Sequence, residues 1–528
     1  MSGPYDDQEF AAPSGQPDYG YISDHTSDYT SGYTSGYTSD YVLPAPLPAP
    51  APTRRRRWPW IAGGAALTAV LLAGGGSLLA YQALSGGGAQ PDSVLPAANA
   101  LAYVRVDLDP SAGQKIAAYR FLRRFGKAGT AFSDGTDPRQ AIFTLVAQSA
   151  HLPAGFDYAH DIKPWLGKRA AVETRMEDGR TVTVVAVQVT DQAAARTAVE
   201  KLAANAGHDV GVAFSGGYAV IGESQPAVDR AISEAHTETL AHDPQFGSDM
   251  KLVGDQGVFS GWADLSRAAQ LPGAEASTAT LLKGRIAFSL RLDAGAAELV
   301  MKSTSPSTTA AATPVAGFPA VGDLPADTVV AAESGGLRRG VDAAFAQAQV
   351  ALGGQQGVDG LEQAYGLRLP QDLDTLLGDR MLFAMGPKQT ADGIPELGVR
   401  SQTDPDAAVA VLHRFTDAVE RSGGGSMPIS YGKAGDGIVV ATDAAYRNAL
   451  AAPSGARLAD TAGFRAAVPD AAGADAVVYA NPAGLAALAE QQQAPAELVN
   501  TLKEFSGFGL TASSTNGVTT VKVRLVAR

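Results

Sequence analysis

The sequence predicts an α+β protein in which a module of antiparallel sheet and helices is duplicated in tandem, preceded by a disordered tail and one transmembrane helix. Two observations lead to this prediction. Short sequence boxes recur in the same order in two halves of the chain, and a long apolar run without Asp, Glu, Lys or Arg follows a cluster of four arginines.

Composition limits both the class of protein and its chemistry. The 528 residues are 45% hydrophobic, which is enough for sizeable cores. The formal net charge of -13 argues against nucleic-acid binding, because such proteins need a basic surface to displace counterions from phosphate. The chain has no cysteine, which excludes disulfides, thiolate nucleophiles, cysteine zinc sites and iron–sulfur clusters. We expect no cofactor.

Residues 1–57 are expected to form a disordered cytoplasmic tail. The first 53 residues contain no Lys or Arg, and they include a near-repeat of Tyr-Thr-Ser-Gly from Tyr29 to Tyr41. Alternating Pro and Ala follow in residues 44–52, a composition typical of an extended spacer. Too few aliphatic residues are present to bury a core, so this part of the chain gains too little from folding.

Residues 58–84 are predicted to form the transmembrane helix. At 1.5 Å per residue this run is roughly 40 Å long as a helix, more than the ~30 Å hydrocarbon core requires. Arginines precede the run and the next basic residue is Arg105, so the N-terminus is expected in the cytoplasm and the C-terminal region outside. The membrane-flanking residues are Arg54, Arg55, Arg56, Arg57, Trp58, Trp60 and Tyr81.

A cleaved secretory signal is the alternative to an uncleaved anchor. Small residues at Gly87, Gly88 and Ala89 offer a cleavage site, and the arginines resemble a twin-arginine signal. The long region before the arginines and the long apolar run favour the anchor.

The region after the anchor is predicted to contain a linker and two copies of one module. We place the linker at residues 85–94, the first copy at 95–302, a Ser/Thr/Pro/Ala connector at 303–322 and the second copy at 323–528. Leu95-Pro96-Ala97 recurs as Leu324-Pro325-Ala326, each time ahead of an apolar run. Because further matches are collinear with this one, an internal duplication is expected.

Both copies repeat the same pattern of strands and helices. Apolar strands at 182–189 and 397–400 are each followed by Thr-Asp and an Ala-rich segment, which predicts capped helices after Asp191 and Asp404. Polar and apolar residues alternate in Thr519 to Arg524, as in an antiparallel sheet with one wet face. Helices are expected to cover the other face.

No common catalytic motif was found in the sequence. Ser248 and Lys251 have the spacing of a serine acylase pair, but the companion motifs of that class are missing. His236, Glu238, His242 and Asp243 lie close enough in sequence to bind a divalent ion. We interpret them instead as the solvated end of a helix, because spacing alone does not provide converging ligands.

Two acidic–basic pairs recur at a spacing of 211 residues, Asp161 and Arg169 in the first copy and Asp372 and Arg380 in the second. Each pair flanks a Leu-Gly step. They either fix a turn between a helix and a strand as an ion pair or line a site, and the structural role is favoured because duplicated residues usually record a shared fold.

A basic amphipathic stretch follows Asp109. Arg120, Arg123 and Arg124 stand beside Tyr119 and Leu122, so this helix has a possible surface or lipid contact on anionic headgroups. An ordinary surface helix with its apolar side in the core explains the same pattern.

Two strings stand out in the first copy. One runs from Leu101 to Lys115 and contains Asp107-Leu108-Asp109-Pro110-Ser111-Ala112-Gly113-Gln114-Lys115, and the other is Lys163-Pro164-Trp165-Leu166-Gly167. In these strings the chain resembles a family of actinobacterial single-pass membrane proteins carrying an extracytoplasmic domain of unknown function. The resemblance implies a location and an architecture but brings no activity, and the second copy lacks the longer string.

These observations predict a non-enzymatic binding module of the cell envelope, anchored in the cell membrane, whose partner is an envelope protein, a glycan or a lipid. Two alternatives stay open. One is an envelope hydrolase or transferase with a site between the two copies, where pockets tend to form. The other is a signalling adaptor that acts through phosphorylation of the cytoplasmic tail.

Overall fold

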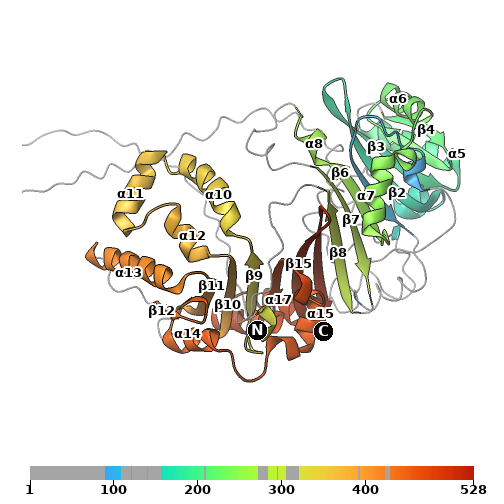
Figure 1. Cartoon of the computed structure of the whole chain (residues 1–528). Coiled ribbons are helices and arrows are strands. Elements are labelled where there is room, and N and C mark those ends of the chain that lie inside the picture. Colours follow the sequence, from blue (N-terminus) through green and yellow to red (C-terminus); the bar gives the residue numbers. More distant parts are fainter. Residues whose placement is uncertain are drawn as a thin grey trace, which may run out of the picture. The chain divides into compact units, whose positions relative to one another are not determined.

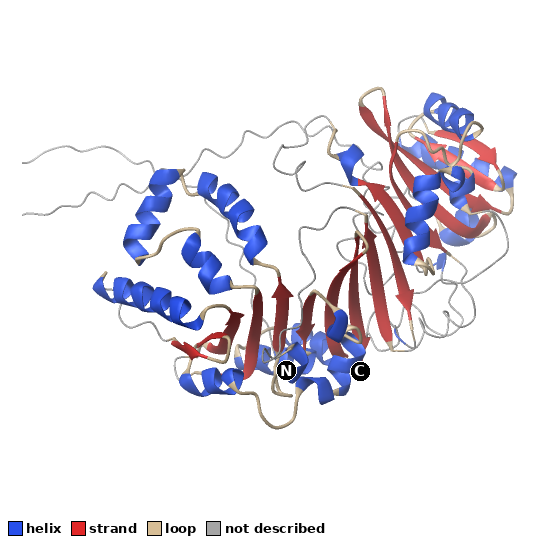
Figure 2. Ribbon diagram, in the orientation of Figure 1, coloured by secondary structure: helices blue, strands red, loops and turns tan. Residues whose placement is uncertain are grey.

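The computed structural model describes residues 90–108, 121, 139–140, 156–206, 210–271, 284–293, 295–304, 320–390, 393–422 and 429–528. This part of the chain is α+β, with one large antiparallel sheet and helices packed on it (Figure 1). Figure 2 shows how the strands run side by side through the molecule. The predicted fold class is therefore confirmed at this level.

The first half of the described chain contains eight strands and seven helical elements. The strands are β1 (Ala100–Asp107), β2 (Leu166–Glu177), β3 (Arg180–Val189), β4 (Gly211–Ser215), β5 (Tyr218–Gly222), β6 (Phe259–Asp264), β7 (Arg285–Leu292) and β8 (Ala296–Ser303). The helical elements are η1 (Pro91–Ser93), η2 (Tyr158–Ile162), α5 (Gln192–Ala206), α6 (Gln225–Ala235), η3 (Leu240–His242), α7 (Pro244–Val253) and α8 (Leu265–Ala268).

The second half adds eight further strands. They are β9 (Val330–Gly335), β10 (Arg380–Gln389), β11 (Pro395–Gln402), β12 (Ser430–Lys433), β13 (Gly437–Ala441), β14 (Ala476–Ala480), β15 (Phe505–Thr515) and β16 (Val518–Ala527). Its helical elements are η4 (Val321–Asp323), α10 (Arg338–Ala351), α11 (Gln355–Tyr365), α12 (Gln371–Leu377), α13 (Pro405–Arg421), α14 (Ala444–Ala451), η5 (Leu458–Asp460), α15 (Ala462–Ala467), η6 (Ala471–Gly473), α16 (Pro482–Gln491) and α17 (Ala496–Lys503).

The strand order is the same in both halves, read outward from the middle of the sheet. It runs β8-β7-β6-β1-β2-β3-β5-β4 in one direction and β16-β15-β14-β9-β10-β11-β13-β12 in the other. Each second-half strand therefore occupies the position of the strand numbered eight lower in the first half (β16 and β8, β9 and β1). The two halves join where β8 pairs with β16.

The predicted strands and caps are found where the alternation and the cap residues indicated them. The apolar runs at 182–189 and 397–400 lie within β3 and β11. The Asp191 carboxylate accepts hydrogen bonds from the amides of Ala193 and Ala194, and Asp404 caps α13 in the same way. These caps could be predicted from the sequence, because a capping side chain bonds to amides within one helical turn of itself.

Two predicted boundaries differ from the structure. Pro91 and Val94, expected in the linker, are buried, and η1 packs near the start of the first half. Val321, expected in the connector, is only 1% exposed and belongs to the second core. The sequence did not predict this burial, because each of the two segments has only isolated apolar residues among polar ones.

The helices around the middle of the sheet cover the opposite face from the one expected. Lys522 and Arg524 share a face with Val526, which lies in one core cluster with Ala467 of α15. A Cβ added to Gly509 on this face would lie 2.3 Å from the carbonyl oxygen of Ala467, so the glycine allows α15 to approach closely. The more apolar face of these strands is left without that cover.

None of the helices among the described residues is long and apolar enough to cross a membrane. The predicted tail at 1–57 and the predicted helix at 58–84 lie outside the described residues.

Ion pairs bridge the junction between β8 and β16 on the face that carries Lys522 and Arg524. Arg524 lies 2.8 Å from Glu298 of β8 and 2.8 Å from Asp293, and its side chain is 20% exposed. Lys302 of β8 donates a hydrogen bond of 2.7 Å to Thr520 of β16. These contacts link the halves in addition to the backbone ladder.

Replacing Arg524 by Leu should destabilise the junction more than replacing Lys522 by Leu. Loss of the Arg524 bonds leaves the largely buried Glu298 with weaker pairing and should lower the free energy of unfolding by about 1–3 kcal/mol. Lys522 pairs with Asp470, which is 54% exposed, so its loss should cost less than about 1 kcal/mol. Urea unfolding of both variants measures the difference, and equal losses would show that the ion pairs do not support the junction.

Candidate binding face

Seven adjacent strands present one face that carries no ionisable side chain. Cross-strand pairing aligns its residues in three rows running from β10 through β9, β14, β15, β16 and β8 to β7, and we call this surface the uncharged face. The first row is Phe383, Ala332, Val478, Leu510, Val523, Leu299 and Leu290; the second is Met381, Ser334, Ala476, Ala512, Val521, Met301 and Phe288; the third is Met385, Val330, Ala480, Phe508, Leu525, Ala297 and Leu292.

The side chains of the uncharged face are not fully buried in its central strands. Leu510, Val521, Val523 and Leu525 are all partly exposed. A face of an antiparallel sheet that meets water normally carries polar residues, and a face packed on a core is buried. The uncharged face combines the composition of a buried surface with partial exposure of most of its residues, which favours an interaction surface.

One side of the uncharged face is in contact with another part of the chain. Phe121 is fully buried and packs in a cluster with Phe259, Leu290 and Leu292, with Leu299 and Leu525 at its border. Apolar groups from outside the sheet therefore fit against this surface.

Hydroxyl groups lie at one end of the uncharged face. Thr519 pairs with Ser303 across the junction and with Ser514 on its other side, and the Ser514 and Thr519 hydroxyl oxygens are 3.2 Å apart. At the opposite end of the same strands Leu525 lies between Phe508 and Ala297. The surface is therefore amphiphilic along the strands, apolar over most of its length and hydroxylic at one end.

Charges are confined to the reverse face of the same strands. Residues 298, 302, 522 and 524 alternate with members of the uncharged face along β8 and β16. Burial lowers the pKa of Lys302, and the positive charge of Lys522 lowers it further. Because successive side chains of a strand point to opposite faces, the charged residues and the apolar rows lie on different faces of these strands.

The recurring pairs Asp161/Arg169 and Asp372/Arg380 serve matching roles in the two halves. Asp161 lies 2.7 Å from Lys201 of α5, and Asp372 lies 2.7 Å from Arg414 of α13. Each carboxylate also accepts a hydrogen bond from the amide four residues earlier. The aspartates thus connect a short helix to the long helix that follows the next two strands.

The arginines of these pairs contact the first strand of their half. Arg169 lies 3.6 Å from Asp107 of β1, and Arg380 forms an ion pair with Glu333 of β9. Each arginine thus links its box to a strand that is distant in sequence. Sequence spacing could not reveal this, because the partners are brought together by strand pairing.

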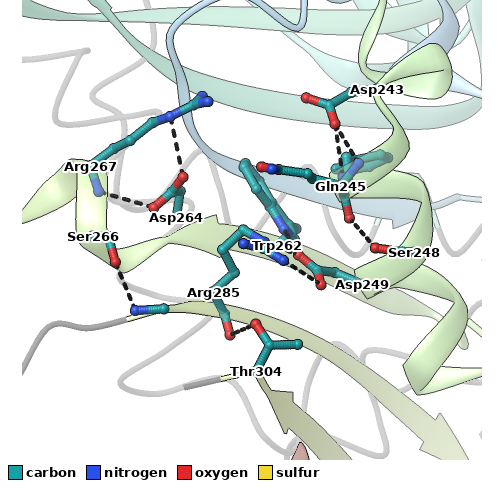
Figure 3. A network of polar contacts seen from close by, with 12 residues as sticks. Asp243, Gln245, Ser248, Asp249, Trp262, Asp264, Ser266, Arg267, Arg285 and Thr304 are labelled. Atoms are coloured by element: carbon teal, nitrogen blue, oxygen red, sulfur yellow. Dashed lines mark hydrogen bonds and ion pairs between the residues drawn. The ribbon is translucent and has the colours of Figure 1, made fainter. Parts of the chain in front are cut away.

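A buried polar network occupies the place of the serine acylase motif (Figure 3). Asp249 of α7 is 2% exposed and accepts hydrogen bonds from the Trp262 indole at 2.9 Å and from the Arg285 guanidinium at 2.6 Å. Ser248 donates to the carbonyl oxygen of Gln245 within the helix, and Lys251 is exposed. The network ties α7 to β6 and β7, which is a structural role.

The residues considered as metal ligands, His236, Glu238, His242 and Asp243, include two that make local contacts. The Asp243 carboxylate caps α7 by accepting from the amides of Gln245 and Phe246, and His242 contacts the Thr239 hydroxyl at 2.8 Å. Within the described part of the chain no group of three His, Asp or Glu side chains is arranged to hold a metal ion.

The remaining predicted residues lie outside the described residues. They are the membrane-flanking group Arg54, Arg55, Arg56, Arg57, Trp58, Trp60 and Tyr81, and the lipid-contact group Arg120, Arg123 and Arg124.

The uncharged face itself was not predicted from the sequence. Its alternation was visible in β16, but the rows depend on which strands are neighbours, and the sequence does not specify this.

Comparison of the chain with protein-family models, curated proteins and solved structures gives no significant match. The resemblance to actinobacterial membrane proteins is therefore still an expectation, and function must be argued from the site.

The first half also contains a carboxyl group buried without a partner. Glu173 of β2 is fully buried between Tyr103 and Val184, and neither of its oxygens has a hydrogen-bond partner. Burial raises its pKa to about 8, although the nearby Arg175 opposes the shift. The position 211 residues later is Ala384, so the second half has no counterpart.

Stability should fall as pH rises toward 8, because the folded chain keeps a proton on Glu173 that the unfolded chain releases near its usual pKa of 4.5. The loss amounts to at most about 1.4 kcal/mol per pH unit within that window. A Glu173→Gln variant should lack this slope, since the amide does not titrate. Urea unfolding between pH 5 and 8 tests this, and parallel slopes for the two proteins would contradict it.

Proposed function

We propose that the chain is a non-enzymatic binding protein of the cell envelope, anchored by residues 58–84, which binds a partner through the uncharged face. The observation that carries the proposal is the union of apolar composition and partial exposure over seven neighbouring strands. Such a surface is costly to leave in water and is stabilised when a partner covers it.

The proposed location rests on the sequence before the described region. The four arginines at 54–57 precede an apolar run long enough to span a bilayer, and this asymmetry favours a cytoplasmic tail with the remaining chain outside. Only residues 85–89 separate the end of that run from the described region. At about 3.5 Å per residue the described region then begins within roughly 20 Å of the membrane.

We also infer that the two halves are a tandem duplication. The mirrored strand order supports this, as do the matching contacts of Asp161 with Lys201 and of Asp372 with Arg414. Duplication explains how the uncharged face became wide, because joining two sheets at β8 and β16 extends one face across both halves without an edge.

The ion pairs at the junction give no support to an enzyme site between the halves. Glu298 and Asp293, two carboxylates beside the pairing of β8 with β16, are both engaged by Arg524. A general acid or base must exchange a proton with its substrate, whereas these groups hold the two strands together.

Two substitutions on β15 test the proposed binding surface in the membrane-bound full chain. Leu510→Asp puts a charge on the uncharged face, and Ser513→Asp puts the same charge on the reverse face; both parent side chains are partly exposed. A proximity-labelling enzyme is fused to the C-terminus, and Leu510→Asp should reduce its labelling of envelope partners at least fivefold. Partner binding would bury the new carboxylate against an apolar surface, which costs more than about 1 kcal/mol of binding free energy. Ser513→Asp should label as the parent does.

Protease treatment of intact protoplasts provides the test of location. The C-terminal region should be digested while the tail is protected. Labelling of cytoplasmic proteins alone, or release of the region uncleaved into the medium, would refute the anchored orientation. Equal labelling by both aspartate variants would show that no envelope protein binds through this face.

A further inference from the structure

We propose that the uncharged face binds the acyl chains of a membrane phospholipid, with the headgroup at the hydroxyl end formed by Ser303, Ser514 and Thr519. This inference rests on the proposed function and names the ligand of the same face.

The chemistry of the surface matches a hydrocarbon chain. An acyl chain has no donor or acceptor beyond its ester, and the three rows offer it no charge and one side-chain hydroxyl, that of Ser334. Three of the seven methionines in the chain, Met301, Met381 and Met385, lie on this face. Their flexible thioethers adapt to irregular apolar shapes, which suits a ligand without fixed conformation.

The size of the surface matches lipid rather than a smaller apolar solute. Neighbouring strands lie about 4.8 Å apart, so the face is roughly 29 Å wide across seven strands. From Leu525 to Thr519 along β16 it is roughly 20 Å long at 3.3 Å per residue. Chains in one leaflet occupy about 15 Å, half of the hydrocarbon thickness, so the face has room for more than one chain.

The polarity of the surface sets the direction of the ligand. The hydroxyl groups of Ser514 and Thr519 are 3.2 Å apart on neighbouring strands, and Ser303 pairs with Thr519. Hydroxyl groups both donate and accept hydrogen bonds, so they can meet phosphate and ester oxygens. Toward the far end, Val523 and Leu525 are partly exposed and offer apolar side chains to the chain ends, beside the cluster that contains Phe121. A partner helix would not require hydroxyl groups at one end of the surface and apolar side chains at the other.

The bilayer next to the anchor is the source of the ligand. Residues 85–99 separate the predicted span from β1, so the sheet stays tethered close to the bilayer and phospholipid is present at high local concentration. Binding would require a lipid to leave the leaflet partly, and the large apolar contact on the face compensates for the lost hydrocarbon environment.

Photocrosslinking of the full chain in vesicles tests the proposal. The vesicles contain phosphatidylcholine and phosphatidylglycerol with a small fraction of phosphatidylcholine bearing a diazirine near the end of one acyl chain. After irradiation, adducts are mapped by peptide mass. Adducts are expected on peptides of β8, β15 and β16 as well as on the 58–84 segment, which reports insertion and serves as the internal control.

The variants separate lipid binding from unfolding. Leu510→Asp should reduce adducts on the sheet at least fivefold, and Ser513→Asp should leave them unchanged. Ala512→Trp fills the same face without adding charge, so it should also reduce adducts even if Leu510→Asp fails to fold. Cooperative thermal unfolding confirms that a variant is folded.

Adducts confined to the 58–84 segment would overturn the proposal. If partner labelling still depended on Leu510 in that case, a protein would occupy the face and the proposed binding function would stand. If sheet adducts were found but did not respond to Leu510→Asp or Ala512→Trp, the lipid would bind elsewhere, and the assignment to this face would fail.

Discussion

The hydrogen-bonded pairing of β8 with β16 is the constraint on which the rest of the structure depends. Eight residue pairs, from Ala296 with Val526 to Ser303 with Thr519, turn two sheets into one. Without this pairing each half would end in an unpaired strand, and unpaired edges invite association with other chains. The pairing also fixes the alternation on both strands, so it decides which side chains share a face across the two halves.

Separation of charge from apolar surface follows from that register. Glu298 and Arg524 meet on one face, whereas Leu299 and Val523 meet on the other. A shift of one residue would place charges among the apolar rows and leave carboxylates without arginine. Close approach of α15 at Gly509 then covers part of the charged face, while most residues of the uncharged face stay partly exposed.

Local features could be predicted from the sequence, whereas features that depend on strand neighbours could not. Caps at Asp191 and Asp404 were found because they act within a turn, and strand positions followed from alternation. The contacts of Arg169 with Asp107 and of Arg380 with Glu333 could not be predicted from the boxes, because these partners lie on other strands. Helix cover was expected on the apolar side, since alternation shows that the faces differ but not which one a helix contacts.

Site-directed spin labelling along β16 tests most directly whether the uncharged face meets an apolar environment. The chain has no cysteine, so single cysteines at positions 519 to 525 are unique labelling sites. In the membrane-bound full chain, access of oxygen relative to a water-soluble nickel chelate should be high at 521, 523 and 525 and low at 520 and 522. A ratio without this period of two, or with the opposite phase, would contradict the account.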